Sequence, residues 1–264
     1  MNRDLESNLA FNLLQPELKG HDVRIYLSQT VGGKNKKVDE LNILEYYEKE
    51  LFYQLPHHLK EVGIQTSFEF LDDDFHLFPL SICEKVNDPK FINEIRSYSP
   101  DLFISIRFGK IFDKEILTLP RYGTFNLHSG ILPDYRGILG TLHALRQGKK
   151  EVGCTLHQID DDRIDTGKII SVAKLKVNIT RSLFWHIVQL YPLGCSMIKK
   201  SIKKIEQGKP IHTRAQDLQS GAYYSLPTGQ HFEDLKMEGF EILSQVDYLE
   251  FLRTFISPDL RIIG

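Results

Sequence analysis

Two polar side chains stand at the end of a short run of strand-forming residues. Asn126 and His128 lie on either side of Leu127, so on an extended backbone their side chains point to the same side. A carboxamide next to an imidazole can donate hydrogen bonds to an oxyanion, and the imidazole can also transfer a proton. This spacing is short, and by itself it marks a buried histidine beside a turn asparagine more often than a catalytic pair.

An acidic turn follows further along the chain. Residues 153–159 and 168–177 are rich in strand-forming residues, and we expect them to pair as an antiparallel hairpin. Their connection carries four aspartates: Asp160, Asp161, Asp162 and Asp165. The adjacent aspartates are compact and lack a second cluster of ligands, which favours a solvated loop over a metal site. Asp165, followed by Gly167, is also typical of a turn-capping aspartate.

Two strand ends are candidate ligand sites, because ligands of an open α/β sheet bind beyond the carboxyl ends of its strands. The strand expected at residues 102–106 is followed by Arg107, Phe108, Gly109, Lys110 and Ile111. The strand expected at residues 124–127 leads into the turn Tyr135, Arg136 and Gly137. That turn either shapes a binding pocket or lies on the surface, and the sequence leaves both open.

The elements that would position these residues alternate between strand and helix. Hydrophobic periodicity and stop signals predict helices at residues 3–18, 40–62, 88–98, 139–147 and 181–206. Strands are predicted at residues 23–27, 65–70, 102–106 and 124–127. This order favours an α/β fold with an open, mostly parallel, Rossmann-like sheet and flanking helices. We place a boundary near residue 210, between a catalytic domain (1–210) and a small C-terminal extension (211–264).

Composition narrows the functional class. The chain has 264 residues and a net charge of −2, which gives no general attraction to nucleic acid. Its three cysteines match no zinc pattern, and together with the lack of a leader they fit a reducing cytoplasm. No apolar run reaches the ~18 residues of a membrane helix. We interpret His143, Cys154 and His157 as packing residues.

In combination, these motifs resemble the folate-dependent formyltransferase family. The likeness covers residues 100–177 and rests on four elements in order: Asn126-Leu127-His128, Leu132-Pro133, Tyr135-Arg136-Gly137 and Asp165-Thr166-Gly167. The family includes methionyl-tRNA formyltransferase, glycinamide ribonucleotide formyltransferase and the sugar N-formyltransferases. The resemblance implies that Asn126, His128 and Asp165 are catalytic. It also implies N10-formyltetrahydrofolate as the formyl donor and no metal.

The resemblance also implies where the folate lies. Its pterin is expected against the main chain of Arg107 to Ile111 and against the loop at residues 159–165, which includes Asp160, Asp161 and Asp162. The acceptor amine would then attack the formyl carbon, while Asn126 and protonated His128 donate hydrogen bonds to the formyl oxygen. His128, or a water held by Asp165, would take the proton of the amine.

The acceptor is expected to be an amino sugar carried on a nucleotide, as in polysaccharide biosynthesis. His128-Ser129-Gly130 and the tail sequence GAYYSLPTGQHFEDL resemble the sugar branch of the family. Tyr223 and Tyr224 in that tail either stack on the nucleotide base or pack internally. A tRNA acceptor is less favoured, because the tail is short and the net charge is −2. Hydrolysis of the folate, or folate binding without catalysis, remain alternatives, and a homodimer is possible by resemblance.

The beginning of the chain departs from the family pattern. Family members start with a buried strand and then turn into the first helix, and here Asn2-Arg3-Asp4 already resembles that turn. We therefore expect the first strand of the sheet to be missing, and the strand at residues 23–27 to face a gap. Such a gap would uncover apolar surface and leave backbone groups unpaired.

Overall fold

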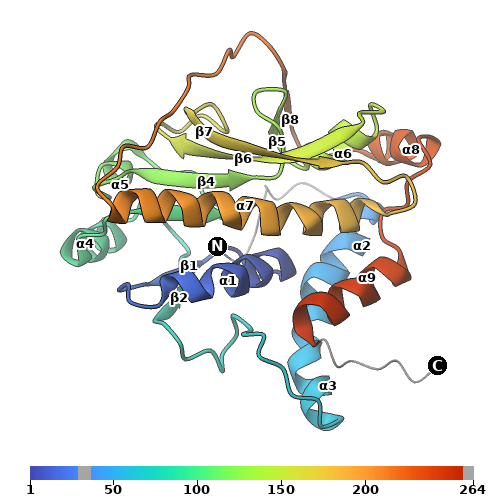
Figure 1. Ribbon diagram of the computed structural model, residues 1–264, viewed down its shortest axis with the longest axis horizontal. Helices are drawn as coiled ribbons and strands as arrows, with labels where there is room; N and C mark the ends of the chain where they lie inside the picture. The colour runs from blue at the N-terminus through green and yellow to red at the C-terminus, as the bar shows by residue number, and fades with distance from the viewer. Residues whose placement is uncertain (29–36, 258–264) are drawn as a thin grey trace.

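The computed structural model describes residues 1–28 and 37–257 (Figure 1). Its α-helices are α1 (Leu5–Leu18), α2 (Asp39–Glu45), α3 (Leu55–Glu61), α4 (Pro89–Tyr98), α5 (Lys114–Leu117), α6 (Gly140–Leu145), α7 (Leu183–Glu206), α8 (Gly229–Met237) and α9 (Gln245–Phe251). Its strands are β1 (Ile25–Leu27), β2 (Leu80–Ile82), β3 (Phe103–Ile106), β4 (Thr124–His128), β5 (Tyr135–Gly137), β6 (Glu151–Ile159), β7 (Ile169–Lys176) and β8 (Ala222–Tyr224).

The central sheet has four strands in the order β3-β4-β6-β7. β3 and β4 run parallel, whereas β4–β6 and β6–β7 are antiparallel. Two separate parallel pairs, β1–β2 and β5–β8, complete the described strands. Three of these five pairs are therefore parallel, which confirms the predicted open and mostly parallel α/β fold. The predicted hairpin of β6 and β7 is also present.

The first three residues lie beside the end of β1. The Ser28 N–H donates to the carbonyl of Met1 at 2.8 Å, and the Arg3 N–H donates to the carbonyl of Ser28 at 3.2 Å. Among the described residues, no strand joins β1 to β3, and the two sheets remain separate. Residues 1–3 therefore pair in part with the end of β1, on the side where the sequence analysis expected a gap.

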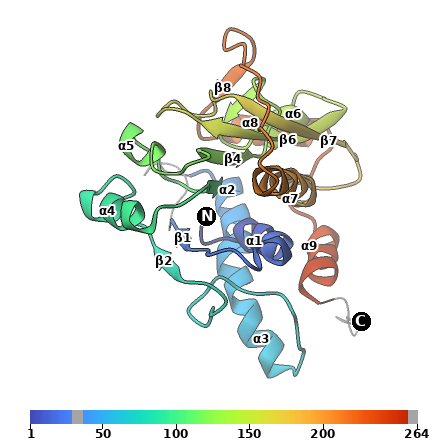
Figure 2. The ribbon, with the colours of Figure 1, turned by 60° about the vertical axis from the view of Figure 1, so that its left-hand side comes forward.

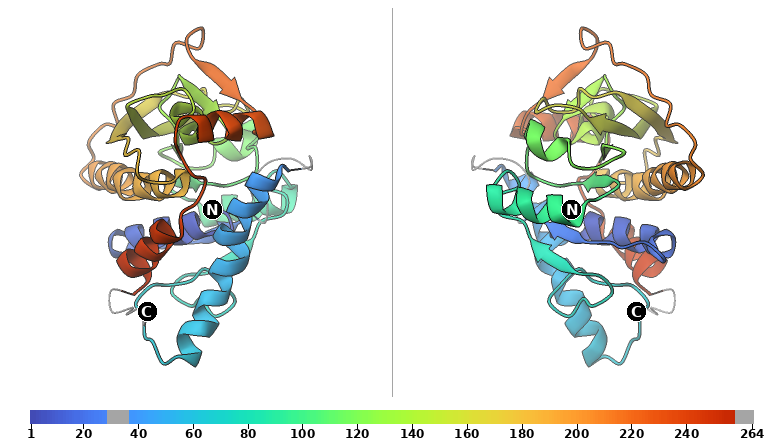
Figure 3. Two further views of the ribbon diagram at one scale, coloured as in Figure 1. Left: turned by 90° about the vertical axis from the view of Figure 1, so that its right-hand side faces the viewer. Right: turned by 90° about the vertical axis from the view of Figure 1, so that its left-hand side faces the viewer.

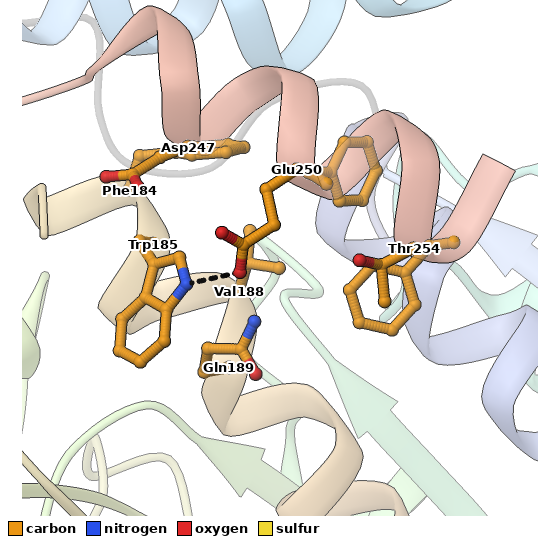
Figure 4. Close-up of a pocket in the computed structure, with 9 residues that line it drawn as sticks. Phe184, Trp185, Val188, Gln189, Asp247, Glu250 and Thr254 are labelled. Carbon is orange, nitrogen blue, oxygen red and sulfur yellow. Dashed lines mark hydrogen bonds between the residues drawn. The ribbon is translucent and has the colours of Figure 1, made fainter. Parts of the chain in front are cut away.

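Helix α7 covers one face of the central sheet. It packs on β6 and β7, and its other side contacts α1 (Figures 1 and 2). The helix begins where the Ser182 hydroxyl accepts a hydrogen bond from the Trp185 N–H at 3.3 Å. α9 crosses α7, and the two helices are joined by a hydrogen bond from Trp185 Nε1 to Glu250 Oε1 at 3.1 Å (Figure 4).

The helix predicted at residues 40–62 is interrupted. A π-helical segment, η1 (Tyr46–Leu51), and a 3-10 turn, η2 (Phe52–Gln54), separate α2 from α3. Pro56 lies in the first turn of α3. Because proline has no N–H to donate, the regular hydrogen-bond ladder cannot continue through this position, and a new helix begins there. Together, α2, η1, η2 and α3 form one elongated helical segment that extends away from the central sheet (Figure 3).

The predicted strand at residues 65–70 is wrong. This segment is extended but pairs with no described strand, because asparagine side chains of α1 satisfy part of its backbone. Asn12 accepts from the Glu69 N–H at 2.7 Å, and Asn8 accepts from the Leu71 N–H at 2.6 Å. Strands β2, β5 and β8 were not predicted, since three residues are too few to show an alternating pattern.

The residues after 210 pack on the same core as those before it. α8 contacts α6, and α9 contacts α7. Their apolar side chains, including Phe232, Leu235 and Phe251, belong to the main hydrophobic cluster. The boundary near residue 210 stays a prediction, and residues on both sides of it contribute to one hydrophobic cluster. In the part of the chain that the structure describes, no helix has both the length and the apolar character needed to span a bilayer.

Candidate active site

The register of β4 and β6 brings two predicted residues together with one that was not predicted. Asn126 lies directly opposite His157, and His128 lies opposite Thr155. The side chains of Asn126 and His157 meet across the two strands, with 3.0 Å between Asn126 Nδ2 and His157 Nε2. His157 also donates from Nδ1 to its neighbour, the carbonyl of Gln158, at 2.7 Å. The imidazole is thereby held with Nε2 towards Asn126.

Asp165 places its carboxylate between two histidines. Oδ2 lies 3.4 Å from His128 Nδ1, and Oδ1 lies 3.3 Å from His157 Nε2. Oδ2 also accepts a hydrogen bond from the Gly137 N–H at 2.8 Å. Burial alone would raise the pKa of Asp165, but His128, His157 and the Gly137 N–H outweigh it and lower this pKa to about 2. The carboxylate is therefore ionised at neutral pH.

His128 is buried, and both of its ring nitrogens face an acceptor. Nε2 lies 2.6 Å from the carbonyl of Tyr135, and Nδ1 faces the carboxylate of Asp165. Because a carbonyl can only accept, Nε2 carries a hydrogen in this arrangement. A ring protonated on both nitrogens would donate to both partners, which agrees with the expected role of Asp165.

The turn that presents Asp165 requires a glycine two residues later. A methyl group on Gly167 would collide with the carbonyl oxygen of Gln158. This close approach occurs where the carbonyl of Lys168 accepts a hydrogen bond from the Gln158 N–H at 2.9 Å, at the point where the two strands enter their connecting loop. Asp165 itself has φ +56°, in the left-handed region. The backbone therefore requires Gly167, whereas Asp165 supplies the carboxylate.

We call Asn126, His128, His157 and Asp165 the His–Asp cluster. All four line a cavity of about 560 Å³, which is within the usual range for small-molecule sites. Three apolar side chains on the cavity wall remain largely exposed: Ile111 (55%), Ile164 (43%) and Tyr223 (53%). The smaller hollow between α7 and α9 leaves no room for a bound molecule, so it is not a competing site (Figure 4).

Most of the residues expected to contact folate lie on this cavity. Its lining includes Arg107, Phe108, Gly109, Lys110, Ile111, Asp161 and Asp162. Asp160 is not part of the lining among the described residues. Its carboxylate instead accepts from the Lys168 N–H at 3.4 Å. Asp161 is paired with Arg163 at 2.6 Å, and the described residues contain no group of three His, Cys, Asp or Glu arranged to hold a metal.

The residues expected to contact the acceptor divide into two groups. Gly137 and Tyr223 line the cavity. Tyr135, Arg136 and Tyr224 are absent from its lining among the described residues. The Tyr224 ring stacks on His143 with 3.9 Å between centroids. Contact of this second group with the acceptor therefore stays a prediction.

The wall of the cavity also includes Arg107 and Glu48, which belong to a second set of buried charges that we call the arginine cluster. Arg107 has φ +52° and turns its guanidinium towards three acids: Asp4 at 2.7 Å, Glu48 at 3.1 Å and Glu6 at 3.5 Å. Burial raises the pKa of Glu6 well above its usual range, and Glu48 and Asp4 add to this effect against the attraction of Arg107. Burial likewise raises the pKa of Glu48.

His157 and the arginine cluster were missed by the sequence analysis. His157 is only 2% exposed, as a packing residue would be, but its Nε2 atom contacts the two catalytic candidates Asn126 and Asp165. Its alignment with Asn126 depends on the β4–β6 register, which the sequence does not display. His143 and Cys154, the other two residues interpreted as packing, are fully buried.

Comparison with known families agrees with the motifs. Residues 76–183 match the family model described as formyl transferase. The chain contains a formyl transferase domain. Methionyl-tRNA formyltransferase of Caldanaerobacter subterraneus subsp. tengcongensis is 32% identical over 159 residues, which are 60% of this chain and 48% of the relative. This chain thus spans about half the length of the curated relatives that it matches.

Solved structures share the fold. A sugar N-formyltransferase from Shewanella sp. superposes with a TM-score of 0.56 and 15% identity, over 90% of this chain and 85% of that chain. WlaRD, a sugar 3N-formyl transferase, superposes with a TM-score of 0.52 and 20% identity, over 85% of this chain and 68% of that chain. At these identities the likeness establishes the formyltransferase fold of this domain.

Proposed function

We propose that this protein is a folate-dependent N-formyltransferase. It moves the formyl group of N10-formyltetrahydrofolate to the amine of a nucleotide-linked amino sugar. The observation that carries the proposal is the convergence of Asn126 and His128, from β4, with Asp165, from the loop between β6 and β7, on one cavity. This is the trio that the family resemblance implies, and the ionised Asp165 holds it together.

The proposed reaction needs a hydrogen-bond donor, a proton acceptor and an amine. The amine attacks the formyl carbon, a new C–N bond forms, and the bond from the formyl carbon to N10 of the folate breaks. Asn126 Nδ2 lies 3.0 Å from His157 Nε2, and its amide group can donate a hydrogen to the formyl oxygen as the negative charge on that oxygen grows. The proton lost by the amine passes through the His–Asp cluster to N10 as the folate leaves.

His128 must change partner during this reaction. Its Nε2 hydrogen is directed to the carbonyl of Tyr135 in the ligand-free cavity. A formyl oxygen bound beside Asn126 would compete for this hydrogen, and the charge that develops on that oxygen favours the exchange. Asp165 stays on the other side of the ring and stabilises its positive charge.

The choice of a sugar acceptor rests on the cavity and on the similar structures. WlaRD was crystallised in the presence of dTDP and 5-N-formyl-THF. In this chain the exposed ring of Tyr223 and the side chain of Ile111 stand on the cavity wall, where flat or apolar parts of two ligands could lie against them. We propose that the folate binds along residues 107–111 and the nucleotide sugar near Tyr223.

A tRNA acceptor is the second candidate, because the curated relatives are methionyl-tRNA formyltransferases. The net charge of −2 argues against it, since tRNA binding depends on phosphate contacts by basic side chains. We expect no specific complex with initiator methionyl-tRNA in a filter assay at physiological salt. Formylation of that tRNA at a rate matching any sugar nucleotide would favour this second candidate.

The proposal is tested by incubating the protein with N10-formyltetrahydrofolate and a panel of dTDP- and UDP-linked amino sugars. We expect at least one sugar nucleotide to gain the mass of one formyl group. Formate release without a formylated product would indicate a hydrolase. If neither product forms, but 5-formyltetrahydrofolate binds in calorimetry, the protein is a folate-binding protein without transferase activity.

A further inference from the structure

A segment after α7 returns to the His–Asp cluster. Residues 214–224, which we call the tail strap, pass from the first residue of β7, next to the β6–β7 loop, to β5. At one end, Arg214 and Ile169 exchange two backbone hydrogen bonds, at 2.8 and 2.9 Å. At the other end, β8 pairs with β5, which includes Gly137. The strap therefore joins the two elements that hold Asp165.

Within this strap, the side chain of Gln216 reaches the turn that carries Asp165. Its Nε2 donates to the carbonyl of Asp165 at 3.0 Å and to the carbonyl of Gly167 at 2.5 Å. Both hydrogens of the amide are used by this one turn. The other end of the amide, Oε1, is buried and has no hydrogen-bond partner among the described residues.

The orientation of this amide is chemically fixed. If the amide were reversed, its oxygen would face the two carbonyl oxygens of Asp165 and Gly167, and both contacts would become repulsive. An unpaired buried acceptor costs free energy, so the observed orientation is retained for its two donor contacts. A side chain that only filled space would not need these two hydrogen bonds.

The position of Asp165 depends on such support. Its backbone has φ +56°, a conformation that costs free energy for a residue other than glycine and persists only where the surroundings enforce it. Gln216 holds the backbone on one side of the turn. On the other side, the Gly137 N–H holds the carboxylate. A methyl group on Gly137 would collide with the carbonyl of Tyr224, so β5 and the strap are in direct contact there.

From these contacts we propose that Gln216 is a positioning residue for Asp165, and that the tail strap is part of the active site. This inference rests on the proposed formyl transfer. The carboxylate of Asp165 lies 3.4 Å from His128 and 3.3 Å from His157. A displacement of about 1 Å at a reacting group can lower a rate by ~10²-fold, so release of the turn would weaken catalysis before it unfolds the domain.

The test uses three variants of the full chain. Gln216→Met keeps the length of the side chain and removes both donors. Gln216→Glu keeps the shape but directs a carboxylate at two carbonyls. Gln219→Met is the matched control, because Gln219 lies in the same strap with an exposed side chain. Turnover is measured with the sugar nucleotide that the panel identifies. The melting temperature and the hydrogen exchange of the Gln158 and Lys168 amides, which are hydrogen-bonded beside this turn, are measured in parallel.

We expect Gln216→Met to lower kcat about 10-fold, a tenth of the effect of losing a catalytic group outright. Exchange at Gln158 and Lys168 should become faster, while the melting temperature stays close to that of the wild type. For Gln216→Glu, the ratio of its kcat to the wild-type kcat should rise as the pH is lowered, because the protonated carboxyl regains one donor. Gln219→Met should match the wild type in every measurement.

Unchanged kcat in Gln216→Met would overturn the proposal, whatever happens to exchange. A fall in kcat accompanied by faster exchange throughout the molecule and a large drop in melting temperature would also overturn it, since that pattern is general destabilisation. If the wild type formylates no acceptor, the proposed function fails. Exchange at Gln158 and Lys168 then decides separately whether Gln216 holds the turn.

Discussion

Two clusters of buried charge border the same cavity and have opposite properties. In the His–Asp cluster, one carboxylate meets two imidazoles and a backbone N–H, and the pKa of Asp165 is lowered to about 2. In the arginine cluster, three carboxyl groups share one guanidinium, and the pKa of Glu6 and of Glu48 is raised. One cluster has a surplus of partners for its carboxylate, and the other has too few partners for its carboxyl groups.

This difference separates a chemical role from a structural one. The His–Asp cluster combines an ionised carboxylate with two imidazole rings that face it, which suits proton transfer. The arginine cluster joins three elements: Asp4 caps α1, Glu48 belongs to η1, and Arg107 follows β3. Burial raises the pKa of Glu6 and of Glu48. The ion pairs with Arg107 hold the three elements together beside the cavity.

The largest expected effect is on stability, at Arg107. Arg107→Met removes the only guanidinium that offsets three buried acids in the described structure. We expect the free energy of unfolding to fall by about 3–5 kcal/mol, as when one partner of a buried pair is removed. Urea unfolding measures this change. The control is Arg96→Met, which removes an exposed pair with Glu115 and should cost less than about 1 kcal/mol.

The second effect is on catalysis, at His128. His128→Ala removes the ring that faces Asp165, and we expect kcat to fall by ~10²-fold or more, the usual scale for general acid–base help. Steady-state rates with the accepted sugar nucleotide measure the change. His57→Ala is a suitable control, because that side chain is 72% exposed. A rate within a few-fold of the wild type in folded His128→Ala would remove the distinction between the two clusters.

Asn126→Ala should separate catalysis from folate binding. Its amide is expected to act on charge that exists only in the transition state, so kcat should fall about 10²-fold. The dissociation constant for 5-formyltetrahydrofolate, measured by calorimetry, should change much less. If that constant rose greatly and kcat stayed the same, Asn126 would contribute to ground-state binding instead.

These residues also show how much of the candidate site can be predicted from the sequence alone. Asn126, His128 and Asp165 were predicted because four short motifs stand in the order that the formyltransferase family shows, although each motif alone is weak. Arg107 was expected to contribute only main chain, since its acidic partners lie as far away as Asp4 in the sequence. Gln216 carries no motif of its own, and its two contacts appear only when the chain returns to the hairpin.

The fold, like the site, could be predicted only where local patterns determine it. The helices at α1, α4 and α7 were predicted because each carries a periodic apolar face over many residues. The segment at residues 65–70 has the alternation of a strand, but the side chains of Asn8 and Asn12 compete for its backbone. Local patterns therefore identified the elements, and long-range side-chain contacts decided which strands form.

The smallest expected effect is the pH dependence of stability at Glu6. A carboxyl group whose pKa is raised by folding stabilises the protein at low pH, and this contribution is lost as the pH rises through the folded pKa. Glu6→Gln should therefore raise the free energy of unfolding at pH 8 by about 1 kcal/mol, and the gain should vanish near pH 4. Urea unfolding at both pH values measures it.

The effect of Asp165→Asn on the free energy of unfolding should depend on pH in a different way, with a loss of stability at neutral pH. The pKa of Asp165 is lowered to about 2, so its contribution is present above the ordinary aspartate pKa and is lost as the pH falls towards 2. This variant should be less stable than the wild type at neutral pH, and the difference should shrink under acid. The same trend in Glu6→Gln and Asp165→Asn would contradict the contrast between the clusters.

The most direct test of the central claim is a single-turnover measurement of formyl transfer. Wild-type protein and folded Asp165→Asn are loaded with N10-formyltetrahydrofolate and mixed with the accepted nucleotide-linked amino sugar, and the formylated product is followed by mass. We predict a rate constant at least ~10²-fold lower in Asp165→Asn, with binding of 5-formyltetrahydrofolate retained. A rate constant within a few-fold of the wild type would show that the His–Asp cluster is not the catalytic centre.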